Sequence, residues 1–112
     1  MITLRKVEEN GKVARLMRCA VEVFRIPQEE IVSLSRKREV VNIRRMMFQI
    51  MRRKFLMDYG RIGSFFGRDH STVLFCVRKH KDFLETEQHY IESFARLNSE
   101  YEKCNGTPEE AR

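Results

Sequence analysis

The sequence of 112 residues has no tryptophan, only two prolines and five glycines, and no long run of hydrophobic residues. A membrane-spanning helix needs roughly 18 consecutive apolar residues, and the first residues of the chain lack the apolar stretch of a signal peptide. The cysteines include no close pair that could clip a zinc ion or form a redox motif: Cys19, Cys76 and Cys104. We therefore expect an intracellular protein with reduced thiols, no metal and no membrane partner.

The length and the hydrophobic content of 42% predict one small domain rather than a two-domain enzyme. We assign residues 1–112 to this single domain and place its core at about residues 12–103. The ends, residues 1–11 and 104–112, are predicted to be flexible. The sequence does not fix an oligomeric state, although a monomer is slightly favoured.

Basic residues are concentrated in the middle of the chain. Residues 36–81 contain thirteen Lys and Arg but only three Asp and Glu, a net charge of +10. Residues 1–35 carry +1 and residues 82–112 carry −5, which together give the total of +6. A basic segment of this kind is typical of a surface that binds a polyanion, although a solvated face of charged helices has the same composition.

Apolar residues recur every three or four positions, and no stretch alternates with a period of two, so the fold class is predicted to be all-α, a small helical bundle. A first helix is expected over residues 12–24, and a short second helix from Pro27 to about Ser33. Residues 34–38 form a basic loop, and a long third helix is expected over residues 39–58. Its methionines are interpreted as core filling.

Residues 60–81 have the pattern of a helix-turn-helix. A short helix over residues 60–66 is followed by Gly67, which allows a tight turn, and by Asp69, which can cap a new helix. Gly63 inside the first helix is expected where the two helices pack closely, since its low helix propensity needs such a reason. A plain helical hairpin would fit the same pattern.

The second helix of this pair has a polar and basic outer face, made by His70, Ser71, Thr72, Arg78, Lys79 and Lys81. Short polar side chains at the start of a recognition helix can reach base edges, and long cations nearby can contact phosphates. This content favours a DNA-binding helix-turn-helix over a plain hairpin.

Three parts of the sequence carry a resemblance to a known family: Ile62-Gly63, GRDHSTV followed by Arg78-Lys79, and the upstream SRKREVV with Arg44. They resemble the DNA-binding C-terminal domain of the bacterial replication initiator family DnaA, specifically over residues 33–80 and more weakly over 12–32 and 81–103. The resemblance implies a Trp-repressor-like helix-turn-helix bundle. It also implies a recognition helix in the major groove and an arginine of the basic loop in the neighbouring minor groove.

The resemblance further implies the roles of nine residues. The major-groove readers would be Asp69, His70, Ser71 and Thr72, and the minor-groove residue would be Arg38. The phosphate or positioning contacts would be Arg44, Arg52, Arg68 and Lys79.

The chemistry of several of these residues allows more than one role. His70 can donate or accept at a base edge, but it could instead cap a helix or lie in the core. Asp69 can accept from cytosine N4 or serve only as a helix cap, and the methyl group of Thr72 can pack against a thymine methyl. Arg38 is suited to a narrow A·T minor groove but could be an ordinary exposed loop cation.

Three differences limit what the resemblance implies. Gly60 stands where the family usually has proline, which predicts a less rigid start of the first helix of the pair. Gly67 stands alone where the family commonly has two glycines, which predicts a turn one residue shorter. The chain also contains no G-x-x-x-x-G-K-[ST] phosphate loop, so we expect no enzyme activity, no cofactor and no bound nucleotide.

We therefore expect a sequence-specific domain that binds double-stranded DNA in replication or transcription control, cytoplasmic and associated with the nucleoid. The alternative is a protein-interaction module that binds a replication protein and has only salt-driven, non-specific affinity for DNA. An RNA-binding function is less favoured, because most phenylalanines fit the core periodicity and exposed aromatic platforms are not predicted.

Overall fold

A computed structural model describes residue 7 and residues 10–105 of the chain. Six helices make up most of the range 10–105: α2 (Gly11–Phe24), α3 (Gln28–Ile31), α4 (Arg38–Arg53), α5 (Tyr59–Ser64), α6 (His70–Thr86) and α7 (Gln88–Asn105). The described residues form no strand, which confirms the predicted all-α class. Of the ends predicted to be flexible, residues 1–6, 8–9 and 106–112 lie outside the described residues.

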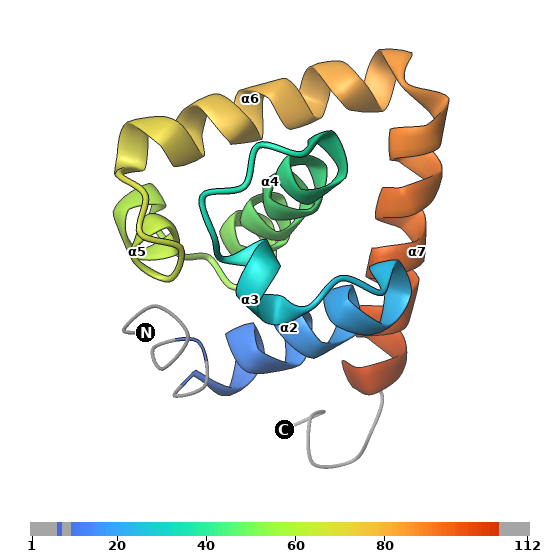
Figure 1. The fold of residues 1–112 in the computed structure, drawn as a ribbon, viewed down its shortest axis with the longest axis horizontal. Coiled ribbons are helices and arrows are strands. Elements are labelled where there is room, and N and C mark those ends of the chain that lie inside the picture. Colours follow the sequence, from blue (N-terminus) through green and yellow to red (C-terminus); the bar gives the residue numbers. More distant parts are fainter. Residues whose placement is uncertain (1–6, 8–9, 106–112) are drawn as a thin grey trace.

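Helix α4 is the centre of the fold and is framed by the other helices (Figure 1). It contacts α2, α3, α5 and α6. Its buried residues lie on most of its circumference: Val40, Ile43, Arg44, Arg45, Met46, Met47, Phe48, Ile50 and Met51. Unbranched methionine side chains fill the irregular gaps between helices that approach from several directions, which confirms their interpretation as core filling.

The predicted end of this long helix at about Asp58 is wrong. Helix α4 ends at Arg53, and Leu56 adopts a left-handed conformation with φ of 57°, which breaks the helical path. Asp58 instead caps α5, where its Oδ1 accepts a hydrogen bond of 2.7 Å from the backbone N–H of Arg61. Aspartate favours such caps because its short side chain satisfies N–H groups that the first helical turn leaves free.

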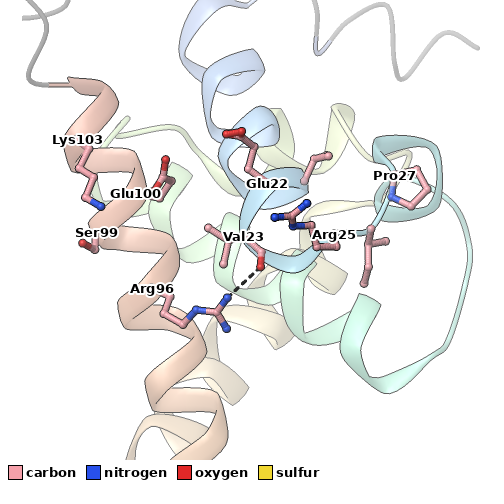
Figure 2. A pocket seen from close by; sticks show the side chains of 10 residues that line it. Glu22, Val23, Arg25, Pro27, Arg96, Ser99, Glu100 and Lys103 are labelled. Atoms are coloured by element: carbon pink, nitrogen blue, oxygen red, sulfur yellow. Dashed lines mark hydrogen bonds between the residues drawn. The ribbon is translucent and has the colours of Figure 1, made fainter.

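Helix α7 closes the bundle by packing along α2 and against the end of α6. At one end of the contact with α2, Arg96 Nη2 donates a 3.0 Å hydrogen bond to the carbonyl oxygen of Val23, in the last turn of α2 (Figure 2). Figure 2 also shows the open groove of about 790 Å³ beside this contact, whose walls carry both acidic and basic side chains. Near the C-terminus of α7, Glu102 forms an ion pair with Lys54, the residue that follows α4.

A buried histidine lies where α6 meets α7. The Nδ1 atom of His80 is hydrogen-bonded to Tyr90 Oη at 2.6 Å, and its ring packs edge-on against Phe94 with 4.4 Å between centroids. Burial, helped by the charge of Arg45, lowers the pKa of His80 to about 4. His80 is therefore neutral at neutral pH and packs as a core aromatic residue.

Gly63 lies where α5 packs closely on the following turn and on α6, as expected. A Cβ atom at this position would lie 2.3 Å from the carbonyl oxygen of Arg68 and 3.2 Å from Cγ2 of Val73. Side chains do not fit at such distances without moving the backbone. The absence of a side chain at Gly63 therefore sets the distance between the two helices.

We predict that Gly63→Ala lowers the free energy of unfolding by about 1–3 kcal/mol, the usual effect of overpacking a well-packed site. Urea denaturation followed by circular dichroism measures this. Gly60→Ala is the matched control in the same helix, because its Cβ would meet only Asp58 Oδ1 at an ordinary 3.5 Å. We expect the control to stabilise the domain by up to about 1 kcal/mol, since alanine loses less entropy than glycine in a helix. Equal destabilisation by both substitutions would contradict the packing argument.

Candidate nucleic-acid interface

Helices α5 and α6 form the predicted helix-turn-helix. The carbonyl oxygen of Gly63 accepts hydrogen bonds of 2.9 Å from the backbone N–H groups of both Phe66 and Arg68, which closes the turn. Gly67 turns the chain with a positive φ of 66°, as predicted. The ring of Phe66 is buried edge-on against Phe48 with 5.0 Å between centroids, so the turn is anchored in the core through α4.

The first turn of α6 is capped by Asp69. Its Oδ1 accepts a 2.9 Å hydrogen bond from the backbone N–H of Thr72, and this bond is the main reason that the pKa of Asp69 is below its usual value. The predicted cap is confirmed. Whether the carboxylate also accepts from cytosine N4 stays a prediction.

The predicted base-reading residues form one exposed group at the start of α6. Asp69, His70, Ser71 and Thr72 are all exposed, whereas Val73 is completely buried. The exposure of His70 excludes the alternative of a core histidine, and the cap position is occupied by Asp69. Short polar side chains at the N-terminus of α6 are thus available to a ligand.

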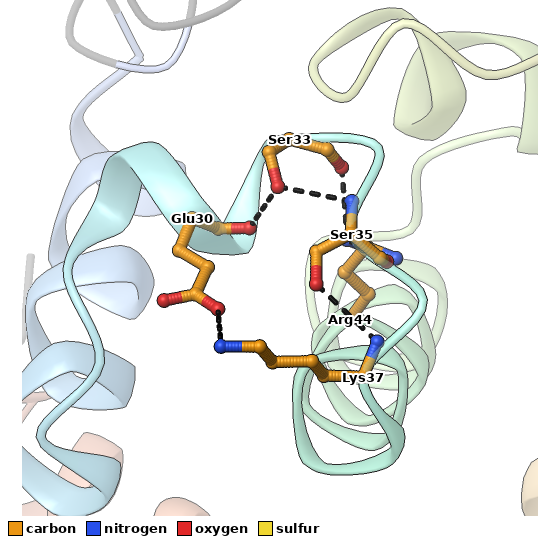
Figure 3. Close-up of polar contacts among 5 residues, drawn as sticks. All are labelled: Glu30, Ser33, Ser35, Lys37 and Arg44. Atoms are coloured by element: carbon orange, nitrogen blue, oxygen red, sulfur yellow. Dashed lines mark hydrogen bonds and ion pairs between the residues drawn. The ribbon is translucent and has the colours of Figure 1, made fainter.

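The basic loop between α3 and α4 has a defined local structure. Ser33 Oγ donates to the carbonyl oxygen of Glu30 at 2.7 Å and accepts from the N–H of Ser35 at 3.1 Å (Figure 3). Ser35 Oγ accepts in turn from the N–H of Lys37 at 3.3 Å, and the Lys37 ammonium pairs with Glu30 at 3.4 Å. These serine turns give a short polar segment a fixed path.

The side chain of Arg44 binds the backbone of this loop. Its guanidinium donates to three carbonyl oxygens, with Nε 2.7 Å from Ile31 and Nη2 2.8 Å from Ser33 and 2.7 Å from Ser35. Only 5% of Arg44 is exposed. Burial, followed by the nearby charge of Arg68, lowers the pKa of Arg44 to about 10, so the group stays charged at neutral pH.

Arg68 connects the same loop to the helix-turn-helix. Its Nη2 donates to the carbonyl oxygen of Ser33 at 3.0 Å, and its Nη1 donates to the carbonyl oxygen of Phe66 at 2.8 Å. The carbonyl of Ser33 is therefore shared by two guanidinium groups, and we call Ser33, Arg44 and Arg68 the Ser33 clamp. The clamp places the basic loop beside the N-terminus of α6.

Arg38 lies at the start of α4 and not at the end of the loop. The prediction that residues 34–38 form the loop is therefore wrong by one residue, since α4 begins at Arg38 after Lys37. Glu39 in the first turn of α4 favours this start, because an acidic side chain there interacts well with the free N–H groups. Arg36, Lys37 and Arg38 are all exposed.

The remaining two predicted contacts are half-buried. Arg52 closes the corner between α4 and α5, where Nη1 donates to the carbonyl oxygen of Met57 at 3.1 Å and the guanidinium lies 4.4 Å from the ring centroid of Tyr59. Lys79 lies on α6 with its ammonium 5.6 Å from the ring centroid of Phe75.

The sequence interpretation missed the exposure of Phe75, which is 57%. The helical register indicates this exposure. Phe75 follows the buried Val73 by two residues, so it points about 200° away from Val73 around the helix. Most of the phenylalanines fit the core periodicity, and Phe75 is an exception to it.

Within the described part of the chain, no helix is long and apolar enough to cross a membrane, and no three His, Cys, Asp or Glu residues gather in a way that could hold a metal. Cys19 is buried and Cys76 is half-buried, and the Cys104 side chain lies outside the described residues.

These features define an all-α helix-turn-helix protein. A family model described as the bacterial DnaA protein helix-turn-helix matches residues 13–79, which is more than half of the chain. The chain belongs to this family of DnaA C-terminal domains, as the resemblance predicted.

Relatives are chromosomal replication initiator proteins of several bacteria. DnaA 1 of Chlamydia pneumoniae is 34% identical over 77 residues, which is 69% of this chain and 17% of the relative. DnaA 2 of Chlamydia caviae is 31% identical over 100 residues, 85% of this chain and 22% of the relative. DnaA of Mycoplasma genitalium is 33% identical over 64 residues, 57% of this chain and 15% of the relative. The chain thus spans less than a quarter of the length of these relatives.

We predict that Arg68→Ala loosens the basic loop in the free protein. The amides of Ser35 and Lys37 should exchange with deuterium faster, and unfolding should need about 1–3 kcal/mol less, because hydrogen bonds from a charged donor are lost. Arg78→Ala is the control, since it removes the same charge from an exposed position of α6. Unchanged loop exchange in Arg68→Ala would show that the clamp does not hold the loop.

Proposed function

We propose that this chain binds double-stranded DNA in a sequence-specific way, with α6 in the major groove and the basic loop in the adjacent minor groove. The observation that carries the proposal is the Ser33 clamp, which fixes the loop beside the exposed start of α6. Two elements that contact neighbouring grooves bind best when the distance between them is already fixed in the free protein. If they became ordered only on binding, the lost conformational entropy would reduce the affinity.

The charge of this surface supports the same proposal. Arg36, Lys37 and Arg38 are exposed beside the two guanidinium groups of the clamp. Such a group of cations raises the local concentration of a polyanion, and contacts to phosphates then fix its register.

We assign different roles to the nine residues. His70, Ser71 and Thr72 contact base edges, Asp69 caps α6 and is near enough to the same bases to accept from cytosine N4, and Arg38 enters the minor groove. Lys79 contacts phosphate. Arg44 and Arg68 position the loop, and Arg52 positions the corner before α5, because their donors already bind backbone carbonyls.

The family membership supports a proposal for the process in which this DNA binding takes part. We propose a non-catalytic, monomeric domain without a nucleotide cofactor, which acts on DNA of the nucleoid in the control of replication initiation or transcription. Its relatives are named as replication initiators, and that assignment comes to this chain as part of the proposal.

Selection of binding sites from a random duplex library tests the proposal, followed by titration of the selected duplex. We expect affinity at least ~10³-fold above that for random duplex. His70→Ala should reduce this ratio about ten- to a hundredfold by removing a base contact, with little change in thermal stability because His70 is exposed. Val73→Ala is the control, since this buried residue should affect binding only through unfolding. Affinity that depends on salt but not on sequence would favour the protein-interaction module instead.

Arg38→Ala tests the minor-groove contact. Its loss of affinity should be larger on duplexes with A·T pairs beside the selected site than on duplexes with G·C pairs there, because the guanine amino group obstructs the minor groove. Competition titrations of both duplexes measure this. Arg36→Ala removes an exposed cation of the loop just before Arg38 and should weaken both duplexes equally. Equal losses for Arg38→Ala would identify it as a phosphate contact.

A further inference from the structure

Phe75 is an exception among the phenylalanines of the described residues. The other seven lie in the core or pack against it: Phe24, Phe48, Phe55, Phe65, Phe66, Phe83 and Phe94. Phe75 exposes 57% of its surface on a helix whose buried side is occupied by Val73 and His80. More than half of the surface of Phe75 is therefore open to solvent and available to a ligand.

Phe75 lies in the second turn of α6, on the outer face of the helix. It follows Ser71 by four residues, about 6 Å along the helix axis, and precedes Arg78 and Lys79 by three and four residues. Residues at these spacings lie on the same face of a helix. The Lys79 ammonium lies 5.6 Å from the centroid of the Phe75 ring, so the ring and the cation occupy one side of the helix.

The surroundings of Phe75 favour a nucleic acid over an apolar protein surface. Its neighbours on the exposed face are hydroxyl groups on the N-terminal side and cations on the C-terminal side. A docking site for an apolar partner would instead be a contiguous apolar patch with a polar rim. A single apolar ring flanked by hydroxyl groups and cations is complementary to the major groove of DNA. There, an apolar group is flanked by the hydrogen-bonding edges of the bases and by the phosphates.

That apolar group is the C5-methyl of thymine. The other bases have no methyl group at their major-groove edges, and a phenyl ring packed against their donors and acceptors would remove these from water without replacing their hydrogen bonds. We propose that Phe75 is a specificity-determining residue that packs against a thymine methyl in the major groove. This inference rests on the proposed DNA binding and assigns one base of the target.

Replacement of thymine by deoxyuridine tests this directly, because it removes the methyl group and keeps base pairing. Each thymine of the selected duplex is replaced in turn, and affinity is measured by competition titration. We expect the replacement at the thymine that contacts Phe75 to weaken wild-type binding about fourfold, the effect of exposing one methyl-sized apolar group. Phe75→Ala should weaken binding to the parent duplex and bind the parent and that deoxyuridine duplex equally.

Three controls make the result specific to Phe75. Leu56→Ala truncates another exposed apolar side chain, 82% exposed at the corner between α4 and α5, and should keep the wild-type response. Phe75→Gln repeats the test with a polar residue suited to an exposed helix position, and circular dichroism checks that each variant is folded. Thymines read by Thr72 should remain sensitive to deoxyuridine in both Phe75 variants.

Several outcomes would overturn the inference. A wild-type protein that is indifferent to every deoxyuridine replacement has no methyl contact. Phe75 variants that keep the full wild-type response show that another residue makes that contact. Phe75 variants that bind the parent duplex like the wild type show that the ring makes no contact with the DNA. Failure to select any duplex is a separate result, which removes the proposed function and this inference with it.

Discussion

The carbonyl oxygen of Ser33 accepts hydrogen bonds from two guanidinium groups, and the arrangement of the exposed surface depends on this shared contact. Arg44 reaches it from the central helix α4, and Arg68 reaches it from the turn before α6. Two cations at this separation repel each other, so they are stable together only because the carbonyls of Ile31, Ser35 and Phe66 bind their remaining donors. The loop is thereby joined to both parts of the domain at once.

Arginine is the residue type that this arrangement requires. Its planar guanidinium presents donors in fixed directions and stays charged when buried, whereas a lysine ammonium is a compact point charge that loses its proton more readily. Another buried titratable group of the domain carries no charge. His80 is kept neutral at the junction of α6 and α7, where its ring packs against Phe94 and bonds to Tyr90. The arginines of the Ser33 clamp thus stay charged at the candidate interface, whereas the buried histidine where α6 meets α7 is neutral.

Rules for helix caps and for glycine placement were sufficient to predict the helix-turn-helix. The cap at Asp69, the positive φ at Gly67 and the close approach at Gly63 each depend on residues a few positions apart. The same rules failed at the end of α4, because apolar spacing continues past Arg53 while Leu56 takes a left-handed conformation. Apolar spacing alone predicts Asp58 as the last residue of one helix, although its side chain is equally suited to begin the next.

By itself the sequence determined the all-α class, the helix-turn-helix and the exposed polar start of α6. These follow from periodicity, capping and glycine placement, all of which act within one or two helical turns. Only the tertiary structure decided that Arg44, Arg52 and Arg68 bind backbone carbonyls and that the loop lies beside α6. Ser33 and Arg68 are 35 residues apart in the chain. A basic residue has the same sequence signature whether it faces solvent or a carbonyl, and the packing of α4 against its neighbours makes that choice.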